Sequence, residues 1–538
     1  MKRKLKSLLT LAIQHKAELL FVGILLLISG FAGGWNMFHY PSYFWDEGTY
    51  MARATAVAYH HSLSPYTYWY DHAPGGWIAI ALWLKLTGGI HAFGAAVNSG
   101  RVLMLIAHLM STFLLYLIAK HYKLGNFFIA IIILFFSLSP LAITLQRMVL
   151  LDNLMVLVML MSLYLIIRFK NIYIGVLSGF LLGLAVLVKE TAIFFIPGML
   201  VLLFQKKPRH HRKFISLVWI AALIATVLTY PIFALLRGEF FPMHSLLGGK
   251  SPHVSLITSI IWQSARKGGA FYSKSSQLYF SLVHSWLYTD PFLITLGFLA
   301  SLAVLIIAFW KRKYLPLAIL TFGYMYYLLR GGIINDQYLI PLIPFFALNI
   351  GVAFSELYQF ARRRKVLKLV AIGLIVGICS SSLLWDGRNA DLYVLDATTP
   401  QVEAINWLEK NTTKSDLTDI DNYAQADLLY TYGPQIYKNY GYQDFWEVDQ
   451  DPRLTNNVLH DNWKNINYIL VTPRMLSVAQ YSTALPLTEN ALKNSSVVIR
   501  YSISYPNSGL SGYLYKESLH RQISIAMTNY VDINKVRH

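Results

Sequence analysis

Long apolar runs recur along this chain from Leu19 to Trp385, and they constrain its fold more than any other feature. A run of about 18 residues or more is long enough to cross the hydrocarbon of a bilayer as a helix. No water lies there to bond a free backbone group, so each run must satisfy its own hydrogen bonds. Charged residues make up only 14% of the 538 positions, against about 25% in soluble domains. The pattern predicts a mainly α, polytopic membrane domain over residues 1–385.

Lysine and arginine residues gather in the short links between these runs. The clusters are Lys2 to Lys16, Lys120 with Lys123, Arg168 with Lys170, Lys206 to Lys213, Lys311 to Lys313, and Arg362 to Lys365. Such an excess of positive charge is typical of cytoplasmic loops. All clusters fall on one side if the N-terminus is cytoplasmic and the number of spans is odd. We therefore expect about eleven transmembrane helices in the cell membrane. The net charge of +19 is explained by this placement, and no nucleic-acid partner is expected.

The boundaries of most spans can be read from the ends of the runs. They are residues 19–35, 99–119, 127–145, 149–167, 172–188, 214–236, 338–354 and 367–385. Spans six and eight end at the basic links that begin with Lys206 and Lys311, and span nine ends at Arg330. After the last span, residues 386–538 contain no apolar run of that length. This tail is expected to lie outside the cytoplasm as a separate α/β domain.

Ionisable and polar side chains occupy the ends of several spans on the side opposite the basic clusters. They are Asp46, Glu47, Asp71, His72, Arg147, Asp152, Lys189, Glu190, and the segment from Asn335 to Tyr338. Such groups are expensive near lipid and usually mark a site. Interfacial charges without a function would be scattered over both faces. The one-sided placement predicts a shared site at the outer ends of the helices.

Two long outer loops flank this site. The first, residues 36–98, is rich in aromatic residues, and its segments 49–59 and 76–86 have the pattern of amphipathic helices lying along the membrane surface. Arg53 and Lys85 are expected on their polar sides. The second loop, residues 237–290, carries Arg266, Lys267 and Lys274. It is either a segment that meets an anionic headgroup or an ordinary solvated loop.

The tail has alternating helix and strand signals. Thr399-Pro400 predicts a helix start, because proline suits the first helical position. Residues 468–471 and 497–499 are short apolar runs of the strand type. Two acid-x-acid sequences, Asp419 to Asp421 and Asp449 to Asp451, have the form that binds a metal with a nucleotide sugar. Nucleotide sugars are absent outside the cell, so these sequences are predicted to be surface turns.

Taken together, the motifs of residues 18–350 resemble those of the C-type (GT-C) membrane glycosyltransferases, in particular the branch of protein O-mannosyltransferases and lipid A aminoarabinose transferases. The motifs are Asp46-Glu47, Asp71-His72-Ala73-Pro74, Arg147 with Asp152, Val188-Lys189-Glu190-Thr191, and Gln337 to Pro344. The resemblance implies a donor in which a sugar is linked to polyprenyl phosphate, and an extracytoplasmic acceptor hydroxyl. It also implies the GT-C fold.

The resemblance gives roles to the site residues, and the chemistry agrees with them. Inverting glycosyl transfer needs a base beside the acceptor hydroxyl. Asp46 is the expected base, with Glu47 positioning the acceptor, and Lys189 and Arg147 are expected to stabilise the leaving phosphate. Arg147 could instead pair with Asp152. Gln337 and Tyr338 are expected to contact substrate.

The motif at Asp71 and His72 departs from the pattern of the family, and this leaves its role open between the acceptor and a divalent metal. Asp46, Asp71 and His72 are metal ligands of acceptable type. No cofactor is otherwise expected. Three other functions stay open: a transporter or flippase of lipid-linked sugars, a polymerase or ligase that moves a whole glycan, and a non-catalytic anchor whose soluble tail binds a partner. Transporters usually hold their charges near the midplane, which favours the transferase.

Overall fold

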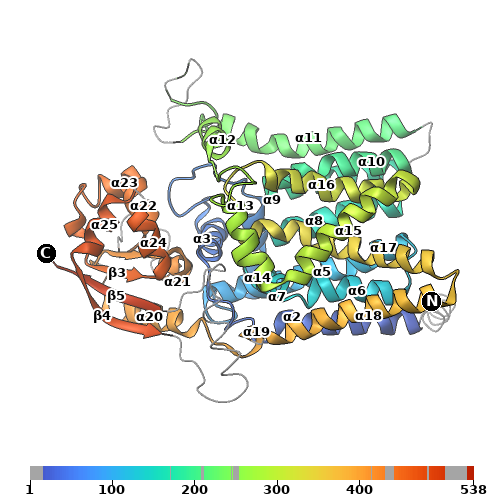
Figure 1. Cartoon of the computed structure of the whole chain (residues 1–538). Helices are drawn as coiled ribbons and strands as arrows, with labels where there is room; N and C mark the ends of the chain where they lie inside the picture. The colour runs from blue at the N-terminus through green and yellow to red at the C-terminus, as the bar shows by residue number, and fades with distance from the viewer. Residues whose placement is uncertain are drawn as a thin grey trace, which may run out of the picture.

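The computed structural model describes most of the chain. The described residues are 16–169, 171–206, 211–243, 245, 254–389, 391–413, 415–430, 441–481, 484–502 and 530–537. Within them a bundle of long helices forms one part, and a mixed sheet with short helices forms the other (Figure 1). The C-terminal sheet covers one end of the bundle, and the first described helix begins at the other end, at Lys16. The expected fold class, a helical membrane protein with a C-terminal α/β region, is confirmed.

Seven helices in the described chain are long and apolar enough to cross a membrane. They are α2 (Lys16–Gly34), α5 (Ala96–His121), α8 (Leu151–Arg168), α11 (Arg212–Leu236), α15 (Pro291–Trp310), η4 with α17 (Asp336–Leu342 and Ile343–Ala361), and α18 (Lys365–Arg388). Three further predicted spans coincide with shorter helices: α9 (Ile172–Val188), η1 with α10 (Glu190–Phe195 and Ile196–Lys206), and α16 (Leu315–Leu329). The short η3 (Arg312–Tyr314) precedes α16.

The third predicted span is present, but it is not one straight helix. It consists of α6 (Asn126–Ser137) and α7 (Pro140–Arg147), which meet at an angle of 59°. Pro140 has no backbone N–H and disfavours a helical residue before it. Ser139 accepts a hydrogen bond from the backbone N–H of Ala142 at 3.2 Å and so caps the new helix. The bend carries Arg147 into the protein at the end of α7.

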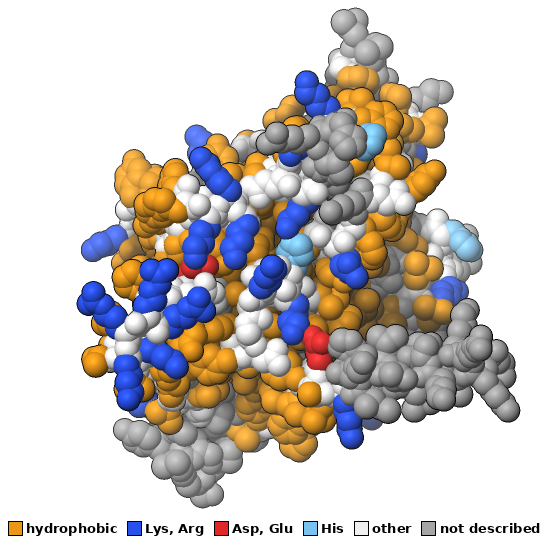
Figure 2. All heavy atoms as spheres, turned by 90° about the vertical axis from the view of Figure 1, so that its right-hand side faces the viewer, with side chains coloured by type: hydrophobic (Ala, Val, Ile, Leu, Met, Phe, Trp, Pro, Cys, Tyr) orange, Lys and Arg blue, Asp and Glu red, His pale blue; other side chains and the backbone are white. Residues whose placement is uncertain are grey.

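The end of the bundle opposite the sheet is strongly basic. Figure 2 shows many lysine and arginine side chains on this face and few acidic ones. Among the exposed ones are Lys123, Arg168, Lys213, Lys311, Arg312, Lys313, and Arg362 to Lys365. This is the asymmetry on which the predicted topology depends. All the predicted site residues lie at the other end, beneath the sheet.

Helices in the two outer loops form a layer between the bundle and the sheet. The first loop contains α3 (Trp45–His60) and α4 (Gly75–Thr87), close to the predicted segments. The second contains α12 (Leu256–Ala265), α13 (Gln277–Phe280), η2 (Ser281–Trp286) and α14 (Leu287–Thr289). The prediction that Arg53 lies on an exposed polar side of α3 is wrong. Arg53 is only 7% exposed, because the C-terminal region covers this helix.

The C-terminal region holds a five-stranded sheet in the order β2-β1-β3-β5-β4. The strands are β1 (Thr418–Ile420), β2 (Tyr442–Asp444), β3 (Tyr468–Val471), β4 (Ser495–Ser502) and β5 (Tyr530–Val536). β1 pairs in parallel with β2 and β3, and β5 pairs in antiparallel fashion with β3 and β4. The helices are α19 (Asp391–Val394), α20 (Thr399–Asn411), η5 (Asn422–Ala424), α21 (Gln425–Tyr430), α22 (Phe445–Gln450), α23 (Pro452–Thr455), η6 (Trp463–Asn465), α24 (Pro473–Tyr481) and α25 (Pro486–Lys493). The predicted helix start and both predicted strands are present.

The prediction of surface turns for the two acid-x-acid sequences is wrong. Asp419 lies within β1 and is fully buried, and Asp421 follows it at 4% exposure. Asp451 is also fully buried. Short polar side chains make these burials tolerable, since Thr488 donates a hydrogen bond to Asp419 at 2.9 Å and Thr472 donates one to Asp421. Buried polar groups of this kind are normally paired.

The C-terminal region presses directly on α3. A Cβ atom at Gly48 would lie 1.9 Å from the backbone oxygen of Asn422, so only glycine fits there. The Asn422 side chain donates a hydrogen bond to the Thr49 hydroxyl at 2.9 Å. The Gln401 amide pairs with both backbone groups of Tyr43, at 2.7 and 2.9 Å. The start of α3 is therefore positioned from both sides, by the bundle and by the C-terminal region.

Candidate functional site

Glu47 holds the start of α3 in place. Its carboxylate is fully buried and accepts two hydrogen bonds from Arg101, both at 2.9 Å. It also accepts from the backbone N–H groups of Val149 at 2.9 Å and Phe44 at 2.8 Å. Four donors occupy the four lone-pair directions of the carboxylate. The structure therefore leaves Glu47 no capacity to position an acceptor, contrary to expectation.

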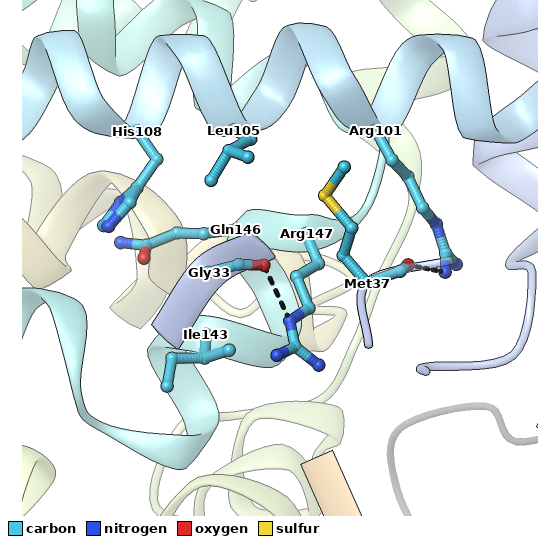
Figure 3. A pocket seen from close by; sticks show the side chains of 8 residues that line it. All are labelled: Gly33, Met37, Arg101, Leu105, His108, Ile143, Gln146 and Arg147. Carbon is cyan, nitrogen blue, oxygen red and sulfur yellow. Dashed lines mark hydrogen bonds between the residues drawn. The ribbon is translucent and has the colours of Figure 1, made fainter. Parts of the chain in front are cut away.

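Arg147 is also fully engaged inside the protein. It is 3% exposed and donates hydrogen bonds to five backbone oxygens, those of Gly33, Tyr40, Leu392, Ala32 and Trp35, at 2.7–3.3 Å. A guanidinium group has five N–H donors. Figure 3 shows Arg147 of α7 bonded to Gly33 in the last turn of α2, and Arg101 of α5 bonded to Met37 in the chain between α2 and α3. The expectation that Arg147 stabilises a leaving phosphate, or pairs with Asp152, is therefore wrong.

Asp46 directly precedes Glu47 in the chain, but its carboxylate has far fewer hydrogen-bond partners. It is partly exposed, and one carboxylate oxygen accepts a hydrogen bond from the Gln337 amide at 3.0 Å. Burial raises the pKa of Asp46, against the opposing fields of Lys189 and Arg474. A carboxylate with a raised pKa is a stronger base. Asp46 keeps the capacity to accept a proton from a hydroxyl group.

Lys189 joins several predicted site residues on one side of Asp46. Its ammonium group lies 3.8 Å from the Asp152 carboxylate and 3.5 Å from Nε2 of His72, and 5.6 Å from the centre of the Tyr338 ring. Nδ1 of the His72 ring lies 3.1 Å from Glu190. These residues come from α8, the link after α9, the first outer loop and η4. The ends of four separated segments therefore meet here, as the sidedness of the sequence pattern predicted.

Asp71 is not part of that group, because it pairs with Arg53 at 2.8 Å. Burial would raise the pKa of Asp71, but the Arg53 guanidinium and neighbouring donors hold it below its usual range. The guanidinium also lies 4.9 Å from the centre of the Trp77 ring. Asp71 thus fixes the chain just before His72. Within the described residues no three His, Cys, Asp or Glu side chains are grouped so as to hold a metal ion.

A cavity of about 490 Å3 opens beside Asp46 and Gln337. Its wall mixes apolar, polar and charged side chains. They are Phe44, Trp45, Leu145, Met148, Leu150, Lys274, Ser275, Ser276, Gln277, Phe280, Ser281, Ile334, Asn335, Asp336, Gln337 and Arg474. The size is that of a ligand pocket. Gln337 belongs to the wall and also bonds Asp46, so it connects the cavity to the carboxylate.

Three charged side chains in or beside this site were not predicted from the sequence to lie there. Arg101 is an isolated charge at the start of an apolar run. Such a charge needs a partner within the protein, so the sequence did contain a signal for its role. Lys274 was noted only as a loop residue. Arg474 lies in the tail, where nothing in the local sequence indicates that it reaches the membrane part. Its contact with this site depends on how the C-terminal region is placed on the bundle.

Comparison with known proteins adds three observations. Residues 71–234 match the family model described as dolichyl-phosphate-mannose-protein mannosyltransferase. The archaeal oligosaccharyltransferase of Archaeoglobus fulgidus, tethered with an acceptor peptide, is similar in structure, with a TM-score of 0.56, 13% identity, and coverage of 93% of this chain and 75% of that one. ArnT of Cupriavidus metallidurans, bound to undecaprenyl phosphate, is similar with a TM-score of 0.51 and 14% identity, and the match covers 97% of this chain and 98% of that one.

A second structure of the archaeal enzyme, in complex with an inhibitory peptide and a dolichol-phosphate, gives a TM-score of 0.54 at 12% identity, covering 91% of this chain and 74% of that one. No match was found among curated protein sequences. At such low identities the structural similarities describe the fold.

Proposed function

We propose that this multi-pass membrane protein, which has the fold of the C-type glycosyltransferases, moves a single sugar from a polyprenyl-phosphate donor to an acceptor hydroxyl. The family match and the neighbours support a glycosyltransferase-type enzyme. Two of these neighbours were solved with undecaprenyl phosphate or a dolichol-phosphate, and this supports a lipid-phosphate donor.

One observation carries the proposal. Asp46 is a partly exposed carboxylate of raised pKa, hydrogen-bonded to Gln337, which lines a cavity with both apolar and cationic walls. The adjacent Glu47 has every acceptor direction filled. Of the two acids, Asp46 is therefore the one equipped to act as a base.

In the proposed reaction, Asp46 accepts the proton of the acceptor hydroxyl as its oxygen attacks C1 of the sugar. The bond between C1 and the phosphate oxygen breaks on the opposite face, and the phosphate leaves with the electron pair. This inverts the configuration at C1. Lys189 lies near Asp46, but Asp152 already balances its charge at 3.8 Å. Its proposed role is to fix the electrostatic field around Asp46 and the reacting phosphate.

We also propose an orientation in which the basic end of Figure 2 faces the cytoplasm and the site end faces outward. The site then meets donors in the outer leaflet and acceptors outside the cytoplasm. The C-terminal region belongs to the same face.

The test is transfer or hydrolysis of radiolabelled undecaprenyl-phosphate sugars by the purified full-length protein, wild type against Asp46→Asn. Asparagine keeps the shape of the side chain and removes the base. The proposal predicts a loss of turnover of about 10²–10⁴-fold with donor binding retained. A wild-type protein that binds these lipids without turning any over would contradict it and favour a transporter.

A further inference from the structure

Arg474 connects the C-terminal region to the cavity. Among the described residues that line the cavity, it alone comes from beyond residue 337. It belongs to the first turn of α24, directly after β3. The Thr472 hydroxyl accepts the backbone N–H of Met475 at 3.1 Å, and Pro473 has no N–H to satisfy. The local sequence therefore fixes the helix start that carries Arg474.

The guanidinium group packs against two aromatic rings of the membrane part. It lies 3.4 Å from the centre of the Trp45 ring and 5.4 Å from the centre of the Phe44 ring. Stacking on an aromatic ring leaves the edge of a guanidinium group available for hydrogen bonds. Trp45 is the first residue of α3 and precedes Asp46. Arg474 is thus fixed within one residue of the proposed base.

This arginine lacks the partners that a structural role would provide. Its NH1 atom is buried with no hydrogen-bond partner, and within the described chain no carboxylate lies within 4 Å of the group. Asp421, Asp46 and Asp444 are the acids whose charges act on it from further away. A cation in the first turn of a helix also opposes the helix dipole. An unpaired buried donor is costly, so stability does not explain this placement.

The cavity beside Arg474 has the composition of a site for an amphipathic anion. Lys274 is a second cation on its wall, and no hydrogen bond or ion pair from it occurs within the described residues. Leu145, Met148 and Leu150 supply apolar surface from the bundle. The one acid on the wall, Asp336, belongs to η4. A soluble anion would not need the apolar wall, whereas a lipid phosphate would use both parts.

We propose that Arg474 binds the phosphate of the lipid-linked donor, so that the C-terminal region completes the donor site. A guanidinium fork matches phosphate oxygens with two parallel hydrogen bonds. The charge then stabilises the phosphate as it leaves, from a position beside Asp46. This assignment rests on the proposed function, because it takes the donor class from there.

The experiment measures binding of radiolabelled undecaprenyl phosphate to purified full-length protein in detergent. It compares wild type, Arg474→Met, Arg474→Lys and Arg500→Met. Methionine keeps the apolar stem without the charge. Arg500 lies in the same region, pairs with Asp532 at 2.6 Å and is not on the cavity wall, so it is the matched control. We expect Arg474→Met to weaken binding about 10- to 100-fold, Arg474→Lys less, and Arg500→Met not at all.

A second variant guards against misfolding of the first. Lys274→Met removes the other cavity cation from an exposed loop position and should weaken binding in the same direction. Wild-type affinity in a folded Arg474→Met protein would overturn the assignment, as would a raised KM for the acceptor with unchanged lipid binding. If the wild type itself binds no undecaprenyl phosphate, the donor class fails, and with it the proposed function.

Discussion

Two charged regions meet at the start of α3, and they differ in how completely their charges are paired. We call Glu47, Arg101 and Arg147 the anchor cluster, and Asp46, Gln337 and Arg474 the cavity cluster. In the anchor cluster every donor and acceptor direction is used within the protein. Among the described residues, the cavity cluster gives Asp46 a single side-chain hydrogen-bond partner and NH1 of Arg474 none. Side chains whose donors and acceptors are all paired within the protein indicate a structural role. Side chains that keep unpaired donors or acceptors indicate a binding site.

Arg101→Met would break the anchor cluster at its centre. Glu47 would keep a buried charge without its cation, which typically costs about 3–5 kcal/mol of stability. Thermal unfolding in detergent should therefore shift to much lower temperature. Lys493→Met removes a solvent-exposed ion pair with Glu489 instead and should unfold close to wild type. Equal unfolding temperatures for the two variants would show that the anchor cluster does not hold the fold.

Lys189→Met tests the border between the two regions. Asp152 would lose the ammonium group 3.8 Å away, and the field around Asp46 would become more negative. We expect turnover to fall about 10²–10³-fold, together with a lower unfolding temperature. Lys85→Met is the control, because Lys85 is exposed and contacts only the Tyr59 ring among the described interactions. Turnover of Lys189→Met within twofold of this control would show that Lys189 does not support the reaction.

Gly48→Ala tests whether the cavity cluster depends on the contact between α3 and the C-terminal region. Its new Cβ would lie 1.9 Å from the Asn422 oxygen, so the two segments must separate. We expect a loss of about 1–3 kcal/mol and weaker lipid binding, because Arg474 moves away from Trp45. At Gly23 a Cβ meets nothing within 4 Å, so Gly23→Ala should be neutral. Identical lipid affinity in both variants would contradict a shared site.

The pH dependence of turnover gives the smallest effect and sharpens the assignment of the base. The base must be ionised, so turnover falls as pH drops through the pKa of Asp46, which burial raises above the ordinary aspartate range. Arg474 lowers that pKa, so Arg474→Met should move the acidic limb to higher pH. Residual turnover can be followed from pH 4 to 8. An unmoved limb would mean that Asp46 does not set it.

Much of the fold could be predicted because it depends on local properties. The length and apolarity of each run define a helix, and the basic links define its sidedness. The meeting of Lys189, Asp152, His72 and Tyr338 followed from sidedness alone. The Ser-Pro sequence at Pro140 indicated a break in the helix. The continuous apolar run nevertheless led to the prediction of a single span.

The roles of Glu47 and Arg147 could not be predicted in this way. Whether a charge is internally paired depends on backbone groups and on side chains such as Arg101, which are distant in sequence. Arg474 was missed for a related reason, since it reaches α3 only through the docking of the C-terminal region. The buried acids Asp419 and Asp451 were missed because short polar sequences normally indicate turns.

One experiment on the two adjacent acids tests most directly whether Asp46, and not Glu47, is the base. Turnover and thermal unfolding are measured together for Asp46→Asn and Glu47→Gln. We expect Asp46→Asn to lose turnover and to unfold close to the wild-type temperature, because Asp46 is partly exposed and an asparagine can keep the contact with Gln337. Glu47→Gln should unfold at a clearly lower temperature and keep turnover in the fraction that stays folded. The reverse pattern, an active Asp46→Asn and a stable but inactive Glu47→Gln, would contradict the central claim.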